Sequence, residues 1–472
     1  MRVSNNKNFQ AKDFGPKRKN RSRYELLDKS GAVRTILIDR TAILITVDSR
    51  DKVQVLKNYS ILIKGGVIKK VARGKLSRNG VDLVYDANQR GGIVVTPGFI
   101  NCHAHPPMYL LRSSMTLDKE DLESSLVKMA KLEQAMTTED FYLGALGDFS
   151  EEQKNGITTT FSHYGVFDPI EKAAKITHQR VINAFSPVSN SHPKNTIAML
   201  KKILAKKSHV TTPAIALHYP HKATMKQLKE LAAIQKKHKL LVTMHAVESK
   251  NLAQACIDVH GLPTAMVLDK VGLLNSRTIL SHAIHFTDIE VKLLAKRKVG
   301  IAHLPTSNRL HNSGNFDYVR FYKAGMANRI ALGTDSVISK NSLDLLTEAL
   351  QTRITHMDKM IIYYEDLFKM MTTNAARILG LSKVGRIAPG FVADLCFWKL
   401  KDRGFLPYNE QKPISLVGNM ITHGGRNIRD LMINGEFIIT NRVHNLIDES
   451  ELLVKLQTAH TALRKRYQGK NK

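Results

Sequence analysis

Apolar and polar residues alternate in two segments near the N-terminus, which is the pattern of strands with one buried face. The segments TILIDRTAILITVD and YSILIKGGVIKKVA show this alternation, and Gly65-Gly66 supplies the positive φ that a tight hairpin turn needs. We therefore expect the first part of a small β domain over residues 31–97. A residue pattern typical of β-strands, with glycines at the predicted turns, returns over residues 385–440. This second segment is too short for a core of its own, so we expect it to complete the same domain.

Between residues 98 and 384 the pattern changes to short apolar runs separated by longer amphipathic stretches. One such stretch, residues 224–239, places Met225, Leu228 and Leu231 at helical spacing. The apolar runs number eight: 93–101, 157–163, 180–187, 214–220, 240–246, 278–284, 299–305 and 330–336. Eight strands alternating with helices are typical of a (β/α)₈ barrel. A doubly wound sheet is the alternative, but it would not usually need eight units.

The predicted fold class is therefore α/β, a TIM-like barrel with a small β-sandwich domain built from both chain ends. The two ends carry concentrated basic residues. We expect a basic flexible tail over residues 1–30 and a basic C-terminal helix within 441–472. No window approaches the 18 apolar residues of a membrane span, and the N-terminus lacks the apolar region of a secretory signal. The three cysteines lie far apart, which suits a reducing compartment, so we expect a cytoplasmic protein.

The net charge is strongly positive, at +30 from 71 Lys and Arg against 41 Asp and Glu. Such a charge raises the alternative of a nucleic-acid or acidic-membrane partner. The lysines, however, are spread along predicted helix faces, and no RRM, zinc-finger or helix-turn-helix pattern accompanies them. We interpret the charge as a solvated basic surface and expect neither a dedicated nucleic-acid site nor a membrane partner.

Histidines and an aspartate gather at the C-terminal ends of the predicted strands. His103 and His105 follow the first strand, His245 ends the fifth, and Asp335 follows the eighth. Residues i and i+2 of a strand share one face, so both imidazoles of the first pair can point into the barrel mouth. A single histidine is more often structural than a ligand, but this combination favours a metal site with N and O ligands, suited to Zn²⁺ or Fe²⁺. Further histidines stand at other strand ends: His218, His221, His282 and His303.

Glu248 follows the fifth strand in the sequence HAVE, three residues after His245. This spacing places a carboxylate just beyond a predicted ligand, where it could carry protons for a metal-activated water. The alternative is a carboxylate that only stabilises the N-terminus of the next helix.

The chain resembles the amidohydrolase superfamily, in the metal-dependent deaminase and chlorohydrolase branch that includes methylthioadenosine/S-adenosylhomocysteine deaminases. The resemblance covers about residues 35–440. The matching segments are TPGFINCHAH, LLR, NGITTTF, HAVES, LSHAIHFTD, AHLPTSN, ALGTDS, NSLDLL and TTNAARILGL with GRIAPGFVADL. The β domain built around a TIM-like barrel by both chain ends is also a feature of that family.

The resemblance implies one divalent metal, zinc most often and iron as the alternative, held by His103, His105, His245 and Asp335. The fourth strand ends without the lysine that two-metal members often carry. By the same resemblance, Asp335 takes a proton from the metal-activated water, Glu248 shuttles a proton to the ring nitrogen and the leaving group, and His282 orients the water. Two substrate-binding residues are also implied, Glu133 for ribose hydroxyls and His221 in a Pro-His step.

These features predict a metal-dependent hydrolase that releases ammonia from an amino-substituted N-heterocycle, adenosine-like or related. The alternatives are hydrolysis of another C–N or C–Cl bond in a triazine or cyclic amide, and a non-catalytic basic binding protein. Two departures bear on the substrate. The tryptophan that relatives carry upstream of Glu133 is missing, and Phe185 stands where an arginine often follows the third strand. We therefore expect neutral nucleosides to be preferred over S-adenosylhomocysteine. Family members are commonly dimers or tetramers, which implies a homo-oligomer.

Overall fold

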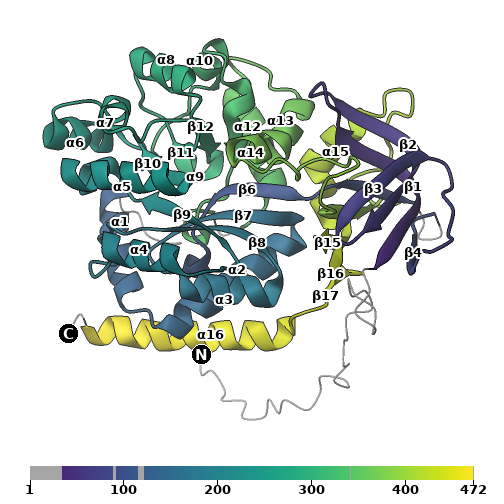
Figure 1. Cartoon of the computed structure of the whole chain (residues 1–472), viewed down its shortest axis with the longest axis horizontal. Coiled ribbons are helices and arrows are strands. Elements are labelled where there is room, and N and C mark those ends of the chain that lie inside the picture. The colour runs from purple at the N-terminus through teal and green to yellow at the C-terminus, as the bar shows by residue number, and fades with distance from the viewer. Residues whose placement is uncertain (1–33, 89–91, 115–121, 341, 471–472) are drawn as a thin grey trace, which may run out of the picture.

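A computed structural model describes residues 34–470 except 89–91, 115–121 and 341, so the predicted tail over 1–30 lies outside the described residues. Eight parallel strands form the barrel, in the spatial order of the sequence (Figure 1). Their bounds are β6 (Phe99–Ala104), β7 (Ile157–Tyr164), β8 (Arg180–Phe185), β9 (Thr212–Leu217), β10 (Val242–Ala246), β11 (Thr278–His282), β12 (Gly300–His303) and β13 (Ile330–Leu332). The predicted α/β barrel is confirmed.

The barrel closes between its first and last strands. A parallel bridge joins Ala104 to Asp335, and the backbone N–H groups of Thr334 and Asp335 donate to the carbonyl oxygen of His103, at 3.1 and 3.0 Å. Since all eight strands run in one direction, their C-terminal ends share one rim of the barrel. The side chains at these strand ends therefore face a common space.

Helices surround the barrel and connect its strands (Figure 1). The predicted helix over 224–239 is α5 (Met225–His238), which buries Leu228 and Leu231 as its spacing indicates. Its N-terminus has a capping box between Thr224 and Gln227. The other helices of this layer are α1 (Leu122–Gln134), α2 (Thr138–Lys154), α3 (Asp168–Thr177), α4 (Ile197–Ala205), α6 (Lys250–His260), α7 (Thr264–Val271), α8 (Asp288–Arg297), α9 (Pro305–Leu310), α10 (Tyr318–Lys323), α11 (Val337–Lys340), α12 (Leu345–His356), α13 (Tyr364–Met371) and α14 (Thr373–Ile378).

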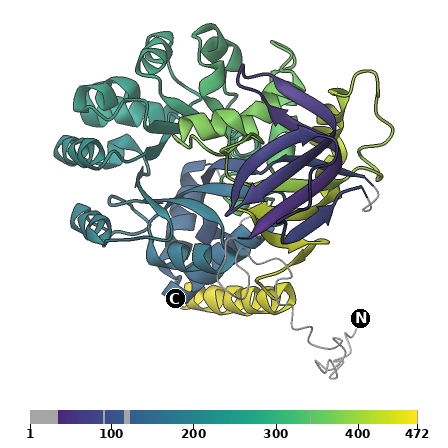
Figure 2. The same ribbon diagram turned by 45° about the vertical axis from the view of Figure 1, so that its right-hand side comes forward.

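Both chain ends contribute to a second, mixed sheet of nine strands beside the barrel (Figure 2). The N-terminal strands are β1 (Thr35–Val47), β2 (Val53–Lys64), β3 (Val67–Arg73), β4 (Leu83–Asp86) and β5 (Ile93–Pro97). The C-terminal strands are β14 (Leu395–Lys399), β15 (Ile428–Ile433), β16 (Glu436–Thr440) and β17 (Val443–His444). The antiparallel pairing of β5 with β14 joins the two ends. The sheet has a core separate from that of the barrel, with Ile36, Ile61, Phe397 and Phe437 fully buried.

The apolar run predicted as one strand over 93–101 is two strands in different sheets, so that prediction is wrong. The chain changes sheet at Gly98, whose N–H donates to the carbonyl oxygen of Asp394 at 2.9 Å. A Cβ atom at Gly98 would lie 2.3 Å from the Thr158 side chain, so only glycine fits where the chain passes this close to β7. Hydrophobic periodicity cannot show this break, because both strands are buried.

The C-terminal segment continues from the β domain through α15 (Ser415–His423) and the last strands to α16 (Glu449–Lys470), which lies along α2 and α3 in Figure 1. Three contacts fix α16 to the barrel side. His460 Nδ1 lies 2.8 Å from the carbonyl oxygen of Leu110, and Arg466 donates to the carbonyl oxygen of Ala135 and to Asp140. The helix thus covers α2. On its other side, α2 contacts the barrel strands β6 and β7 through the buried residue Glu152.

His444 connects the last strand of the β domain to α2. Its Nδ1 accepts the N–H groups of Leu446 and Ile447, and its Nε2 lies 2.7 Å from Gln153 Oε1. Burial lowers the pKa of His444 from 6.5 to about 3, so the folded protein holds a neutral imidazole. The contribution of His444 to stability is therefore present above pH 6.5 and is lost as pH falls towards 3.

We expect replacement of His444 by Asn, which does not titrate, to weaken the pH dependence of stability. Between pH 7 and pH 5 the native protein should lose about 2 kcal/mol more unfolding free energy than His444→Asn. Denaturant unfolding at the two pH values measures this difference. Equal losses in both proteins would contradict the assignment of a neutral, buried His444.

No helix in the described part of the chain is long and apolar enough to cross a membrane. The three cysteines, Cys102, Cys256 and Cys396, are all buried and free.

Candidate metal centre and active site

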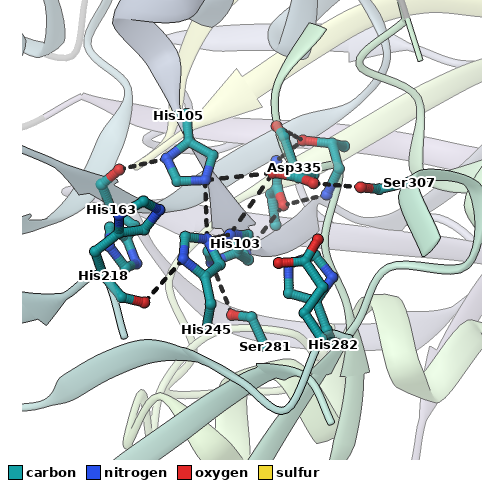
Figure 3. A network of polar contacts seen from close by, with 12 residues as sticks. His103, His105, His163, His218, His245, Ser281, His282, Ser307 and Asp335 are labelled. Carbon is teal, nitrogen blue, oxygen red and sulfur yellow. Dashed lines mark hydrogen bonds and ion pairs between the residues drawn. The ribbon is translucent and has the colours of Figure 1, made fainter. Parts of the chain in front are cut away.

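Three imidazoles converge at the C-terminal rim of the barrel (Figure 3). His103 lies in β6, His105 follows that strand directly, and His245 lies in β10. The Nε2 atom of His245 is 3.2 Å from that of His103 and 3.3 Å from that of His105. A tetrahedral zinc site with Zn–N bonds of about 2.0–2.1 Å places its ligand atoms about 3.3–3.4 Å apart. Both distances from His245, with all three ligand atoms within 4.8 Å of one another, therefore fit a shared divalent metal.

The other ring nitrogen of each histidine fixes the tautomer that a metal requires. His105 Nδ1 lies 2.7 Å from the carbonyl oxygen of His163, and His245 Nδ1 lies 3.0 Å from that of His218. A carbonyl oxygen only accepts, so both Nδ1 atoms carry a proton, and the neutral form of either ring directs the lone pair of Nε2 at the metal position. The Nδ1 atom of His103 pairs with the Ser281 hydroxyl at 2.8 Å. The hydrogen bonds thus orient all three rings for ligation.

Asp335 adds a carboxylate to the same point from the end of the eighth strand. Its Oδ1 lies 3.3 Å from Nε2 of His105 and 3.8 Å from Nε2 of His103, while its Oδ2 accepts the Ser307 hydroxyl. The backbone of Asp335 is in the left-handed region, at φ 58°, which aspartate tolerates better than most residues. Three nitrogens and one oxygen make a donor set suited to zinc.

The electrostatics of the cluster favour neutral rings at His103 and His245 beside an ionised Asp335. Burial acts to lower the pKa of His105, but its hydrogen bond to Asp335 outweighs burial and raises that pKa, so a metal would displace that proton. Burial is the largest factor that lowers the pKa of His103 and of His245 well below the usual value, and neighbouring histidines lower both further. Burial acts to raise the pKa of Asp335, but its bond to His105 and the nearby imidazoles outweigh it and hold that pKa well below normal. Neutral imidazole and ionised carboxylate are the forms that bind a metal.

Glu248 and His282 lie together beside the three imidazoles. Oε2 of Glu248 is 3.6 Å from Nε2 of His282 and accepts the hydroxyl of Tyr219 at 2.6 Å. The Nδ1 atom of His282 lies 2.8 Å from Oδ1 of Asn308, and its ring centroid is 5.3 Å from that of His245. Glu248 is 4% exposed and lies outside α6, which begins at Lys250. A buried carboxylate at this distance from an imidazole can exchange protons with it through one small shift.

Two histidines at the same rim were not assigned roles from the sequence. His163, at the end of β7, stacks on the ring of His245 with centroids 4.6 Å apart, and its Nδ1 has no hydrogen-bond partner among the described residues. His218 follows β9, and its ring centroid is 5.0 Å from that of His245. The strand-end position that identified the other histidines also marks His163. His303, in contrast, pairs with His356 at 3.3 Å and packs on Phe316, away from the three converging rings.

A small cavity of about 60 Å³ opens beside His105 and is lined in part by the predicted substrate residue Glu133. The described residues that line it are His105, Met108, Leu126, Met129, Glu133, His163, Tyr164, Gly165, Ser186, Ser189, Ser191, His192 and His218. Burial alone would raise the pKa of Glu133, but its hydrogen-bonding neighbours His192, Ser191 and Tyr164 hold that pKa below its usual value. Glu133 therefore presents an ionised carboxylate at the cavity.

The two remaining positions singled out for the substrate lie elsewhere. His221 is not among the described residues that line the cavity, and its ring stacks on Tyr219 with centroids 5.4 Å apart. Phe185 is 2% exposed and belongs to the hydrophobic core between the barrel and its helices. The next residue, Ser186, lines the cavity instead. Contact of His221 with a substrate stays a prediction.

Comparison with known proteins identifies the family. Residues 94–438 match the family model of the amidohydrolase family, and the chain belongs to that family of hydrolases. It is 30% identical over 406 residues to 5-methylthioadenosine/S-adenosylhomocysteine deaminase of Pyrococcus furiosus, which covers 84% of this chain and 94% of the relative. It is 26% identical over 438 residues to 5′-deoxyadenosine deaminase of Methanothermobacter thermautotrophicus, covering 90% of this chain and all of the relative (100%).

Solved structures share the fold. An adenosine deaminase from Xanthomonas campestris with bound zinc superposes with a TM-score of 0.80 at 22% identity, over 91% of this chain and 98% of the other. An atrazine chlorohydrolase from Arthrobacter aurescens complexed with zinc gives a TM-score of 0.80 at 20% identity, over 90% of this chain and 100% of the other. Both support the barrel with its attached β domain.

Proposed function

We propose that this protein is a zinc-dependent deaminase that hydrolyses the exocyclic amino group of an adenosine-like nucleoside and releases ammonia. The observation that carries the proposal is the convergence of three imidazoles beside Asp335: Nε2 of His245 lies 3.2 Å from that of His103 and 3.3 Å from that of His105, and the three ligand atoms lie within 4.8 Å of one another. The deaminase names of the relatives from Pyrococcus and Methanothermobacter, and the zinc in two solved structures of the same fold, support it. Fe²⁺ is the alternative ion for this donor set.

The residues around the metal site have distinct tasks in this proposal. The metal supplies Lewis acidity, which makes water a nucleophile near neutral pH. Asp335, ionised and hydrogen-bonded to Ser307, would accept the first proton of the attacking water. Glu248 would give its proton to the ring nitrogen, take up the second proton of the water and pass that proton to the leaving amino group; the proton held by Asp335 would then restore Glu248 for the next turnover. His282, held by Asn308, would orient the water and stabilise the developing negative charge.

The cavity beside the site supports a neutral nucleoside as substrate. Glu133 offers a carboxylate that accepts hydrogen bonds from two vicinal hydroxyls, such as those of a ribose. No lysine or arginine is among the described residues that line the cavity, so they provide no cation for a substrate carboxylate. An unpaired carboxylate would lose its hydration without compensation. We infer that adenosine or a 5′-modified neutral nucleoside is preferred over S-adenosylhomocysteine.

Replacement of Glu133 by Gln should weaken nucleoside binding while leaving the metal in place. A hydrogen bond to a charged group contributes roughly 1.5–3 kcal/mol, so we expect KM to rise by about 10-fold or more. Steady-state kinetics with adenosine and with its 2′,3′-dideoxy analogue distinguishes loss of the contact to the ribose hydroxyls from a general loss of activity. The variant should lose discrimination between the two nucleosides. An equal loss on both would show that Glu133 does not contact the hydroxyls.

The second candidate function is hydrolysis of another C–N or C–Cl bond on the same site, as the name of the atrazine chlorohydrolase with this fold indicates for that protein. Ammonia, chloride and alkylamine release from nucleosides, free bases, pterins and triazines distinguishes the two. Ammonia from nucleosides supports the deaminase, whereas product only from triazines would replace it. A metal-loaded protein that turns over none of these compounds would contradict both.

We further propose a cytoplasmic location, supported by the three buried, unpaired cysteines, which suit a reducing compartment. Self-association stays a prediction from the resemblance.

A further inference from the structure

Of the neighbouring strands in the barrel, β6 and β13 share the fewest paired residues. We call the junction between them the seam. Elsewhere, adjacent strands share at least three paired residues, as in β12 with β13 or β11 with β12. Among the described residues, β6 is joined to the segment after β13 by one bridge, Ala104 with Asp335, and by the two backbone hydrogen bonds to the carbonyl oxygen of His103. These two segments carry the proposed ligands His103 and Asp335. The geometry of the metal site therefore depends on how well this seam is held.

The side chain of Asn101 connects the two sides of the seam. Asn101 lies on β6, two residues before His103, and is fully buried. Its Oδ1 accepts the backbone N–H of Thr334 at 3.0 Å and that of His103 at 3.3 Å. Its Nδ2 donates to the hydroxyl of Thr334 at 2.7 Å. The Asn101 amide thus binds the backbone of His103 on one side of the seam and Thr334, the residue before Asp335, on the other side.

Glu152 on α2 holds Asn101 in this orientation. Its Oε1 accepts Nδ2 of Asn101 at 2.5 Å, and its Oε2 accepts the hydroxyl of Thr160 on β7. Glu152 is fully buried, and burial raises its pKa to about 7. A buried acid is costly unless its oxygens are hydrogen-bonded. The contacts that satisfy this carboxyl group are the ones that direct the Asn101 amide towards the seam.

We propose that Asn101 and Glu152 are positioning residues that hold His103 and Asp335 at metal-binding distance. The inference rests on the metal centre proposed above. The network acts by keeping the first and eighth strand ends together, so that a bound metal does not lose one ligand through opening of the seam. Hydrogen-bonding partners that orient metal ligands commonly change metal affinity by about 10–100-fold when they are removed.

The neighbouring residue Gln153 provides a matched control on the same helix. It is also fully buried, but its Nε2 donates to the carbonyl oxygen of Thr177 at 2.8 Å and to Gln179 at 3.0 Å. Its Oε1 faces Nε2 of His444. Gln179 in turn donates to Thr160 at 3.0 Å and to Glu152 at 3.4 Å, so Gln153 reaches the network only through another residue. Among the described residues, Gln153 forms no hydrogen bond with Asn101, Thr334 or a proposed ligand. Loss of Gln153 should therefore lower stability without loosening the seam.

The test measures zinc release from the zinc-loaded protein into excess chelator, which needs no substrate. Asn101→Ala and Glu152→Ala should release zinc about 10-fold faster than the native protein or more. Glu152→Gln should restore slow release, because its amide oxygen accepts the same bond from Asn101. Thr334→Val removes only the hydroxyl at nearly constant volume, so it folds with least disturbance and should also release zinc faster. Gln153→Ala should release zinc at the native rate even if its Tm falls.

Two results would overturn the inference while leaving the metal centre intact. Native release rates in Asn101→Ala and Thr334→Val would show that the seam needs no such support. Equal acceleration in Gln153→Ala and Glu152→Ala would show a general effect of destabilising α2. If the native protein itself binds no zinc, the metal centre is wrong and the inference fails with it. Zinc binding without deamination would contradict the proposed substrate chemistry alone.

Discussion

Glu248→Gln should lower kcat for ammonia release by on the order of 10²-fold or more, while zinc content and KM stay close to the native values. The amide keeps the size of the carboxyl group and can still accept the hydroxyl of Tyr219, but it cannot carry a proton. Nε2 of His282, 3.6 Å from Glu248, would then have no proton-exchanging carboxylate beside it. Steady-state kinetics on the best nucleoside, with elemental analysis of the same preparation, measures both effects.

Tyr219→Phe is the control for this variant, because it removes one hydrogen bond to Glu248 and leaves the carboxyl group in place. Its effect on kcat should be much smaller than that of Glu248→Gln. Native activity in Glu248→Gln would show that this residue only stabilises the start of α6, as the sequence alone allows. Loss of zinc in Glu248→Gln would instead assign the carboxylate to the metal.

His103→Ala should lose both bound zinc and activity. His103 is fully buried, and its Nε2 lies 3.2 Å from that of His245 and 3.8 Å from Oδ1 of Asp335. Without this ring the site keeps two nitrogens and one carboxylate, one protein ligand fewer than the proposed set, so zinc should be held more weakly and be removed by dialysis. Elemental analysis after dialysis measures the metal, and ammonia release measures the activity.

His303→Ala is the matched control, since His303 is also a buried histidine at a strand end but pairs with His356. It should keep its zinc. Full zinc retention in His103→Ala would contradict the proposed ligand set, and loss of zinc in both variants would indicate unfolding rather than removal of a ligand.

Much of the site could be predicted from strand ends alone. Parallel strands bring their C-terminal residues to one rim, so His103, His245 and Asp335 meet although more than two hundred residues separate the first from the last. The i and i+2 spacing of His103 and His105 also holds, because both Nε2 atoms face His245. Regular backbone geometry is sufficient for these predictions.

The features that the sequence did not reveal depend on contacts between distant segments. The change of sheet at Gly98 is set by the close approach of Thr158, which no local pattern encodes. The cavity wall around His192 comes from a segment after β8, where the ring is held next to Gly165 and Glu133. The connection of Asn101 to Glu152 spans 51 residues and two elements. Such contacts follow from tertiary packing rather than from periodicity.

In the proposed function, a metal held by three histidines and one aspartate enables this chain to deaminate a nucleoside. Ammonia release from adenosine and 5′-deoxyadenosine by the native protein, before metal removal, after metal removal and after addition of one equivalent of zinc, tests it most directly. We expect activity to disappear with the metal and to return at about one zinc per chain. Undiminished ammonia release from the metal-free protein, or none from the zinc-loaded protein, would contradict the account.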